Sequence, residues 1–98
     1  MIRREGSRLV LSGAVTLGNA ATLLDEGKRH LAEGVQTVDL GEVSEMDSAL
    51  LALLLAWLRE AKARGRSLKF TNLPEALRTI ARLYGVDALL PVASEAAA

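Results

Sequence analysis

The 98-residue chain has room for one hydrophobic core, and half of its residues are hydrophobic. Twelve basic and twelve acidic residues cancel, and only 3% of the residues are aromatic, so neither the basic excess nor the base-stacking surface of a nucleic-acid-binding protein is present. The absence of cysteine excludes disulfides and thiolate metal sites. The longest apolar run, residues 49–58, covers about half of the roughly 20 residues that a membrane span needs. We therefore expect a cytoplasmic protein without nucleic-acid partners and without direct membrane insertion.

The first third of the chain predicts strands and then a helix. Runs over residues 8–12 and 14–17 predict two short strands, joined by a hairpin turn at Ser12-Gly13. Asn19 is the expected N-cap of a helix that runs to about Glu33. Gly27 stands mid-helix, where glycine costs about 1 kcal/mol relative to alanine, so close packing is expected there.

The remaining elements alternate between strands and helices. We predict a strand over residues 35–40, a polar loop over 41–47, a long helix over 48–64 and a strand over 67–71. A further helix is expected to begin around Pro74 and to end before Gly85, with a core face formed by Leu77, Ile80, Ala81 and Tyr84. This order predicts an α/β fold with partly parallel strands. We expect one domain over residues 1–92 and a disordered alanine-rich tail over residues 93–98.

No constellation of residues predicts catalysis. His30 is the only histidine and stands among charged residues of a helix, so a solvated surface residue is the favoured interpretation. A general base would need an acid or nucleophile as a partner, and no phosphate-binding glycine loop is present. We therefore predict no catalytic residue, no cofactor and no metal, and a chain that is not an enzyme.

The long helix carries more apolar surface than its own core requires. At about 100° per residue, its core face is formed by Leu50, Leu53, Leu54, Trp57, Leu58 and Ala61. Its outward face and the flanks of that face are formed by Ser48, Ala49, Leu51, Ala52, Leu55, Ala56, Arg59, Lys62 and Ala63. The outward face holds no charge before Arg59, whereas an ordinary exposed face carries charged residues from its first turn.

Two interpretations of this outward face remain open. Alanine is the best helix former, and Leu51 and Leu55 can lie half-buried at a boundary. Alternatively, the small side chains form a flat docking surface for a partner protein, with these two leucines as anchors. We favour docking, and the predicted partner-binding residues are Asp47, Ser48, Ala49, Leu51, Ala52, Leu55 and Arg59.

Ser48 also has two interpretations. As an N-cap its hydroxyl would accept a hydrogen bond from a first-turn N–H, worth about 1 kcal/mol, but Asp47 can cap equally well. As the exposed tip of a docking helix, Ser48 is a candidate for phosphorylation, because a helix N-terminus favours added negative charge. Asp47 would oppose that charge by repulsion.

Residues 43–51, which follow the expected strand ending in Asp39-Leu40, resemble the signature of the STAS domain family. In that family a strand with Asp-Leu leads through a loop to Asp-Ser or Asp-Thr at the start of a long helix, as in Asp47-Ser48 here. The resemblance implies a STAS (anti-anti-sigma-like) fold with a four- to five-stranded mixed sheet and three to four helices. Within the family, residues 51–55, 80–86 and 89–91 are similar to the MlaB-like subunits of bacterial phospholipid ABC transporters.

The resemblance implies a non-enzymatic accessory subunit in the maintenance of outer-membrane lipid asymmetry. Such a subunit binds the transporter's ATPase (MlaF-like), with Ser48 as the contact, and lies at the inner face of the inner membrane through that partner. The alternative is an anti-anti-sigma factor regulated by phosphorylation of Ser48. STAS sequences commonly place glycine soon after this serine, and Ala49 and Leu50 here favour the transporter role. The isolated chain is also a candidate for homodimerisation through its apolar face.

Overall fold

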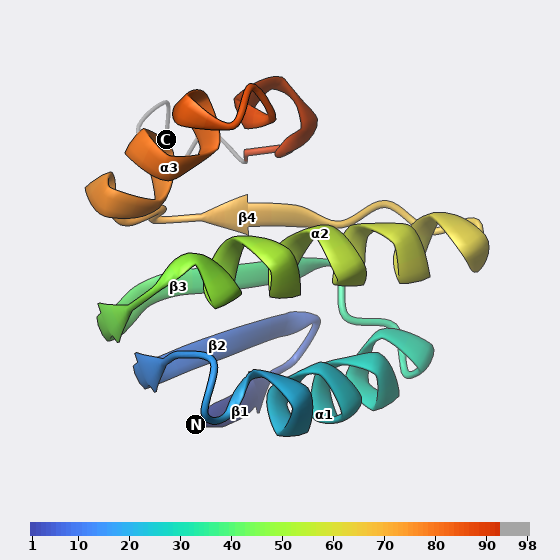
Figure 1. The fold of residues 1–98 in the computed structure, drawn as a ribbon. Helices are drawn as coiled ribbons and strands as arrows, with labels where there is room; N and C mark the ends of the chain where they lie inside the picture. Colours follow the sequence, from blue (N-terminus) through green and yellow to red (C-terminus); the bar gives the residue numbers. More distant parts are fainter. Residues whose placement is uncertain (93–98) are drawn as a thin grey trace.

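The computed structural model describes residues 1–92, which form a four-stranded mixed sheet and three α-helices (Figure 1). The strands lie in the order β1 (Ile2–Glu5), β2 (Arg8–Val15), β3 (Thr37–Met46), β4 (Lys69–Thr71). The first pair is antiparallel and the other two pairs are parallel. The helices are α1 (Ala20–Ala32), α2 (Ser48–Ala63) and α3 (Glu75–Leu83), followed by the 3-10 helix η1 (Asp87–Leu89). The predicted α/β class is confirmed, and the predicted tail over residues 93–98 lies outside the described residues.

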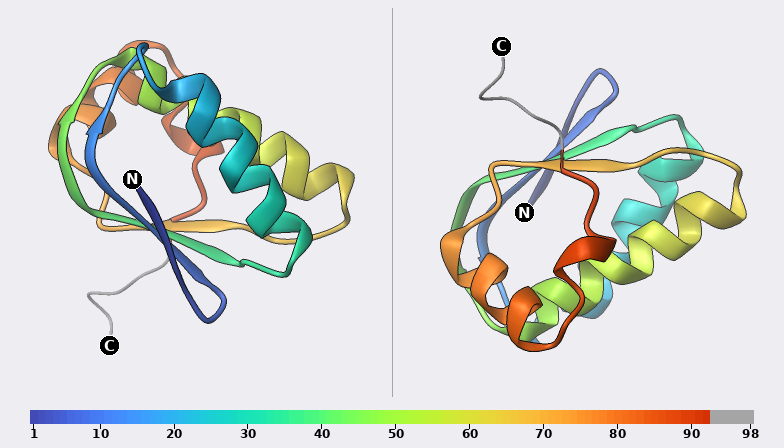
Figure 2. Two further views of the ribbon diagram at one scale, coloured as in Figure 1. Left: turned by 90° about the horizontal axis from the view of Figure 1, so that it is seen from below. Right: turned by 90° about the horizontal axis from the view of Figure 1, so that it is seen from above.

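Helices α1 and α2 lie side by side along one face of the sheet, and α3 lies beyond the β4 edge (Figures 1 and 2). The core fills the space between this face and the helices. Its largest fully buried side chains include Trp57, Phe70, Leu9, Leu11, Leu40, Leu50 and Leu54. On α3 the prediction was partly wrong, because Leu77 and Ala81 are buried but Tyr84 is 61% exposed.

The predicted hairpin at Ser12-Gly13 was wrong. Residues 8–15 form one continuous strand, and Gly13 lies at an irregularity in its pairing with β3, with a positive φ of 76°. The hairpin lies earlier, at Gly6-Ser7, and joins β2 to the edge strand β1. The Ile-Arg-Arg-Glu sequence of β1 gives no apolar alternation, because three of its four residues are exposed, as is common for the edge of a sheet.

The predicted polar loop over residues 41–47 was also wrong. Strand β3 continues through Gly41 to Met46, because β2 pairs with it along this length from Ser12↔Glu42 to Val15↔Met46. Tertiary pairing therefore overrides the weak strand preference of glycine, serine and glutamate. The extension brings Asp47 directly to the end of a strand, where α2 begins.

Close contact between Gly27 and Trp57 joins α1 to α2. An ideal Cβ atom placed on Gly27 would lie 2.2 Å from the indole ring of Trp57, so only glycine fits. The indole Nε1–H donates a hydrogen bond to the backbone oxygen of Leu24 at 3.2 Å. The predicted close packing at Gly27 is thus confirmed, and the fully buried Trp57 has its polar atom satisfied.

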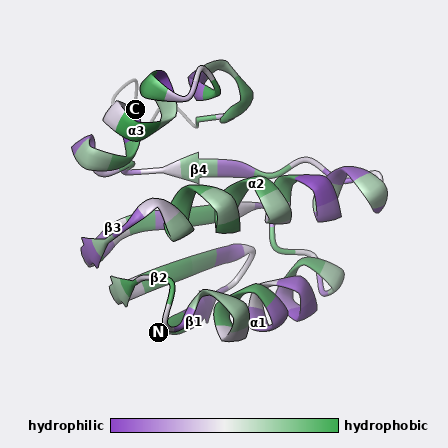
Figure 3. Cartoon of the chain, viewed as in Figure 1, coloured by the Kyte–Doolittle hydropathy of each residue, from purple (hydrophilic) through white to green (hydrophobic). Residues whose placement is uncertain are grey.

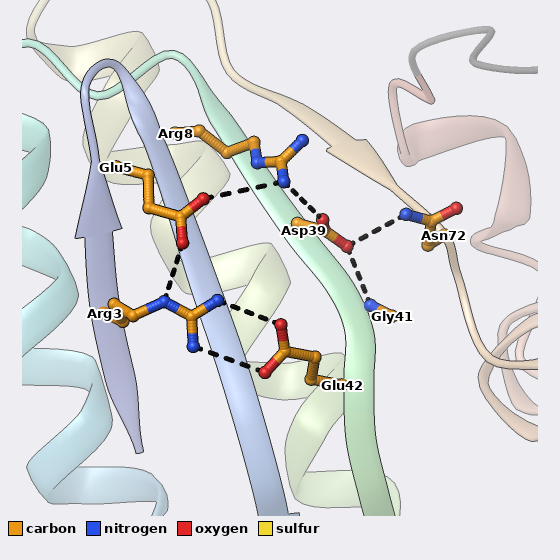
Figure 4. Close-up of polar contacts among 7 residues, drawn as sticks. All are labelled: Arg3, Glu5, Arg8, Asp39, Gly41, Glu42 and Asn72. Atoms are coloured by element: carbon orange, nitrogen blue, oxygen red, sulfur yellow. Dashed lines mark hydrogen bonds and ion pairs between the residues drawn. The ribbon is translucent and has the colours of Figure 1, made fainter.

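A network of charged side chains covers the opposite face of the sheet (Figure 4). Val38 and Leu40 point into the core, so Asp39 between them points to the other face. Its Oδ1 accepts hydrogen bonds from the N–H of Gly41 at 2.8 Å and from Nδ2 of Asn72 at 3.0 Å. Its Oδ2 lies 3.3 Å from Nη2 of Arg8. The other members of the network are Arg3, Glu5 and Glu42.

This network favours the ionised form of Asp39. Burial alone would raise the pKa of this carboxyl, but the hydrogen bonds from Asn72 and Gly41 and the nearby charges of Arg8 and Arg3 outweigh it and lower the pKa below its ordinary value. The carboxylate therefore stabilises the folded chain when ionised.

We expect Gly27→Ala to destabilise the chain by about 2 kcal/mol, because overpacking a core typically costs about 1–3 kcal/mol and outweighs the propensity gain of alanine. Urea denaturation measures the free energy of unfolding. Thr22→Ala, at an exposed position of the same helix, is the control and should change stability little. Gly27→Ala should destabilise a Trp57→Phe background less than it destabilises the parent chain, because the smaller ring leaves room for the added methyl group. Strictly additive effects of the two substitutions would contradict the proposed clash.

We expect the folded chain to lose stability as the pH falls below the ordinary range of an aspartate. The folded pKa of Asp39 is lowered, so its contribution is present above the unfolded value of about 3.9 and is lost as the pH falls through the folded pKa. Asn72→Gly keeps the positive φ of 55° accessible but removes one hydrogen bond to Asp39. Its unfolding free energy, measured in urea across the acidic range, should depend less on pH than that of the parent chain. Equal acid sensitivity would contradict this role.

Candidate docking surface

The start of α2 is fixed by Asp47, which caps the helix. Its Oδ1 accepts a hydrogen bond from the N–H of Ala49 at 2.8 Å, and its Oδ2 accepts one from the N–H of Leu17 at 3.0 Å. The sequence left Asp47 and Ser48 as candidates for the N-cap, and the structure shows that Asp47 is the cap. Ser48 is the first residue of the helix and is exposed, so its hydroxyl is available for other contacts.

A groove of about 590 Å³ lies between the N-terminal parts of α1 and α2. We call it the α1–α2 groove. Figure 3 shows that hydrophobic residues dominate the first turns of α2, whereas hydrophilic residues appear toward its far end. The groove is lined by Leu17, Ala20, Ala21, Leu24, Asp47, Ser48, Ala49, Ala52, Leu53, Ala56 and Arg59.

Most of the predicted partner-binding residues come together in this groove. They are Asp47, Ser48, Ala49, Ala52 and Arg59. The placement of Leu51 on the outward flank was wrong, because only 4% of its surface is exposed. Leu51 belongs to the buried core cluster, which also includes Leu77 of α3, and α3 packs against α2, a contact that a helical wheel of α2 alone does not include. Leu55 is half-buried and lies outside the α1–α2 groove.

Sequence reasoning missed the wall that the α1 side contributes. Leu17 is 81% exposed in the turn before α1, and Ala20 and Ala21 occupy the first helical turn. That turn has no acidic residue, although a helix N-terminus usually favours one. The signal was present in the sequence as a second charge-free helix start, but only the topology places it beside α2.

The described part of the chain contains neither a cluster of metal ligands nor a helix that could span a membrane. Over residues 1–92, His, Cys, Asp and Glu form no cluster of three or more that could hold a metal ion. Among the same residues, no helix has the length and apolar character needed to cross a membrane.

Asn19 occupies the N-cap position of α1 as predicted, but its side chain bonds Thr16 and Ala14 instead of capping the helix.

Comparison with known proteins gives the family. A family model described as "Mlab, STAS domain" matches residues 1–91. The intermembrane phospholipid transport system binding protein MlaB of Escherichia coli (strain K12) is 31% identical over 85 residues, which cover 87% of each chain.

Solved structures agree on the fold. The anti-sigma factor antagonist SpoIIAA in its unphosphorylated form superimposes with a TM-score of 0.72 at 17% identity, over 99% of this chain and 90% of SpoIIAA. An anti-sigma factor antagonist from Thermotoga maritima gives a TM-score of 0.73 at 15% identity, over 94% and 83% of the two chains. These similarities confirm the predicted STAS fold, and the family match and the MlaB relative together show that the chain belongs to the MlaB-type STAS domain family.

Proposed function

We propose that this chain is a non-enzymatic accessory subunit that docks through the α1–α2 groove on the ATPase (MlaF-like) of an ABC-type phospholipid transporter. By this contact it supports the assembly and activity of the ATPase, and it lies at the inner face of the inner membrane through that partner. The observation that carries the proposal is the open, apolar groove at the start of α2, with Asp47 and Ser48 at its rim.

The residues of the groove suit a protein partner. Five alanines line it, Ala20, Ala21, Ala49, Ala52 and Ala56, and alanine loses no side-chain entropy when a partner covers it. Leu17 adds a large apolar side chain at the edge, and burying a leucine fully is worth about 1.5–3 kcal/mol. Arg59 supplies a charge at the far end, in the polar rim that interfaces usually have.

The relatives support the transporter assignment. The E. coli relative is named a binding protein of an intermembrane phospholipid transport system, and it aligns with 87% of this chain.

Anti-anti-sigma activity is the second candidate, and one observation favours it. Ser48 is exposed at the first position of α2 while Asp47 does the capping. The serine hydroxyl is therefore free to be phosphorylated without loss of the helix cap, and the fold is shared with SpoIIAA. The carboxylate of Asp47 beside it opposes the added charge.

The docking proposal is tested by placing a charge in the groove. We expect Ala52→Glu and Ala21→Glu each to weaken binding to the cognate ATPase at least about tenfold, a loss of about 1.4 kcal/mol, because each leaves an unpaired carboxylate in an apolar contact. Biolayer interferometry with the purified ATPase measures the affinity. Ala21→Glu adds an acidic residue to the first turn of α1, where it favours the helix, so unfolding cannot explain its effect.

The control is Ala63→Glu, the same substitution at an exposed position of the same helix that lies outside the α1–α2 groove. This variant should bind the ATPase as the parent chain does. Normal binding by both groove variants, or equal loss in the control, would rule out the groove as the interface.

Phosphorylation separates the two candidate functions. For an accessory subunit we expect no change in the intact mass of the chain when it is incubated with ATP and a serine kinase. The kinase used is the one whose gene lies nearest to the gene of this chain. An increase of one phosphoryl group that disappears in Ser48→Ala would favour the anti-anti-sigma role. Ser48→Ala should unfold at nearly the same urea concentration as the parent chain, because Asp47 provides the cap.

A further inference from the structure

We propose that a second groove on α2, separate from the proposed ATPase contact, binds an acidic amphipathic peptide segment. This groove has a volume of about 600 Å³ and lies between the C-terminal half of α2, the segment that enters β4, and the η1–Pro91 segment. We call it the basic groove. It is lined by Leu55, Leu58, Arg59, Ala61, Lys62, Arg66, Ser67, Leu68, Lys69, Leu89 and Pro91.

The charge of this groove is of one sign. Its lining includes four cationic side chains, Arg59, Lys62, Arg66 and Lys69, and no acidic one. Within residues 1–92, none of these four lies within 4 Å of a carboxylate oxygen, whereas Arg3, Arg4, Arg8 and Arg64 all form such pairs. The whole chain carries no net charge. Four cations that have no ion-pair partner among residues 1–92 gather in one concave site, where they create a local positive potential that attracts an anionic ligand.

The floor of the groove is apolar. It is formed mainly by leucines, of which Leu55 and Leu58 are half-buried and Leu89 is 61% exposed. A purely hydrophilic polyanion would leave this apolar floor in contact with water or with the charged groups of the ligand. The complementary ligand has apolar side chains for the floor and carboxylates for the rim.

The shape of the groove favours a peptide over a lipid. A flat bilayer surface can reach the cationic rim and the exposed Leu89, but not the half-buried Leu55 and Leu58. A single acyl chain would remain partly in water, because the groove lies open on the surface and does not enclose its contents. An amphipathic helix or extended segment lays one apolar face into such a groove and keeps its acidic residues at the rim.

The basic groove and the α1–α2 groove share only Arg59. Lys62 and Arg66 line the basic groove alone, so they can be changed without touching the proposed ATPase contact. Peptide binding at the basic groove can therefore be tested independently of ATPase binding at the α1–α2 groove.

The test is a selection from a library of short random peptides displayed on phage, with the intact chain as bait. We expect enrichment of peptides that combine Asp or Glu with Leu, Ile or Phe. When the selected peptides are synthesised and added to the chain, NMR chemical-shift changes should map them to the basic groove. The variant with both Lys62→Glu and Arg66→Glu should lose at least about tenfold in affinity for them. Binding should also weaken as salt is raised.

Arg29→Glu is the matched control, since Arg29 is exposed on α1 and lines neither groove; it should bind the selected peptides normally. Failure to enrich any acidic amphipathic peptide, or selected peptides that bind the double variant as well as the parent chain, would overturn the proposal. So would a result in which only phosphatidylglycerol vesicles bind the chain and the double variant abolishes that binding. That outcome would assign the cations to a membrane surface.

Discussion

Contact between Gly27 and Trp57 sets the spacing of the two main helices. With no side chain on Gly27 and the indole held to the backbone of Leu24, α1 can approach α2 more closely than two ordinary helices. The contact lies beyond the first turns of both helices. Toward their N-terminal ends the facing residues become Ala20, Ala21 and Ala52, which are too small to fill the space, and this leaves the α1–α2 groove. The groove is thus a product of the same packing that holds the core.

Much of the fold could be predicted from the sequence, and the errors have definable causes. The periodicity of α2 and the stop at Gly65 gave its bounds to within one residue. The edge strand β1 was not predicted, because three of its four residues are charged and exposed. Gly13 suggested a turn, because glycine favours both turns and strand irregularities. The extension of β3 depends on pairing with β2, which is a property of the folded sheet and not of residues 41–46 alone.

The candidate site was predictable only on the α2 side. The absence of charge before Arg59 correctly indicated small residues at this surface, where Ala52 is exposed and Ala49 is half-buried. A helical wheel, however, describes one helix in isolation. It could not indicate that Leu51 belongs to the buried core, nor that Leu17 from a distant turn completes the groove. Both facts require the tertiary arrangement. The basic groove was likewise invisible, because its cations come from α2 and from the chain that enters β4.

For a partner that docks in the α1–α2 groove as proposed, Asp47 affects how fast the partner can associate. One carboxylate binds the backbone on both sides of the α1–α2 groove, at Leu17 and at Ala49. The two lips are therefore held in register in the free chain, and a partner need not first order a loop to engage them. Preorganisation of this kind lowers the entropic cost of association and permits encounter without a slow rearrangement step. Differences in residence time among variants should then arise from the quality of the contact and not from reshaping of this surface.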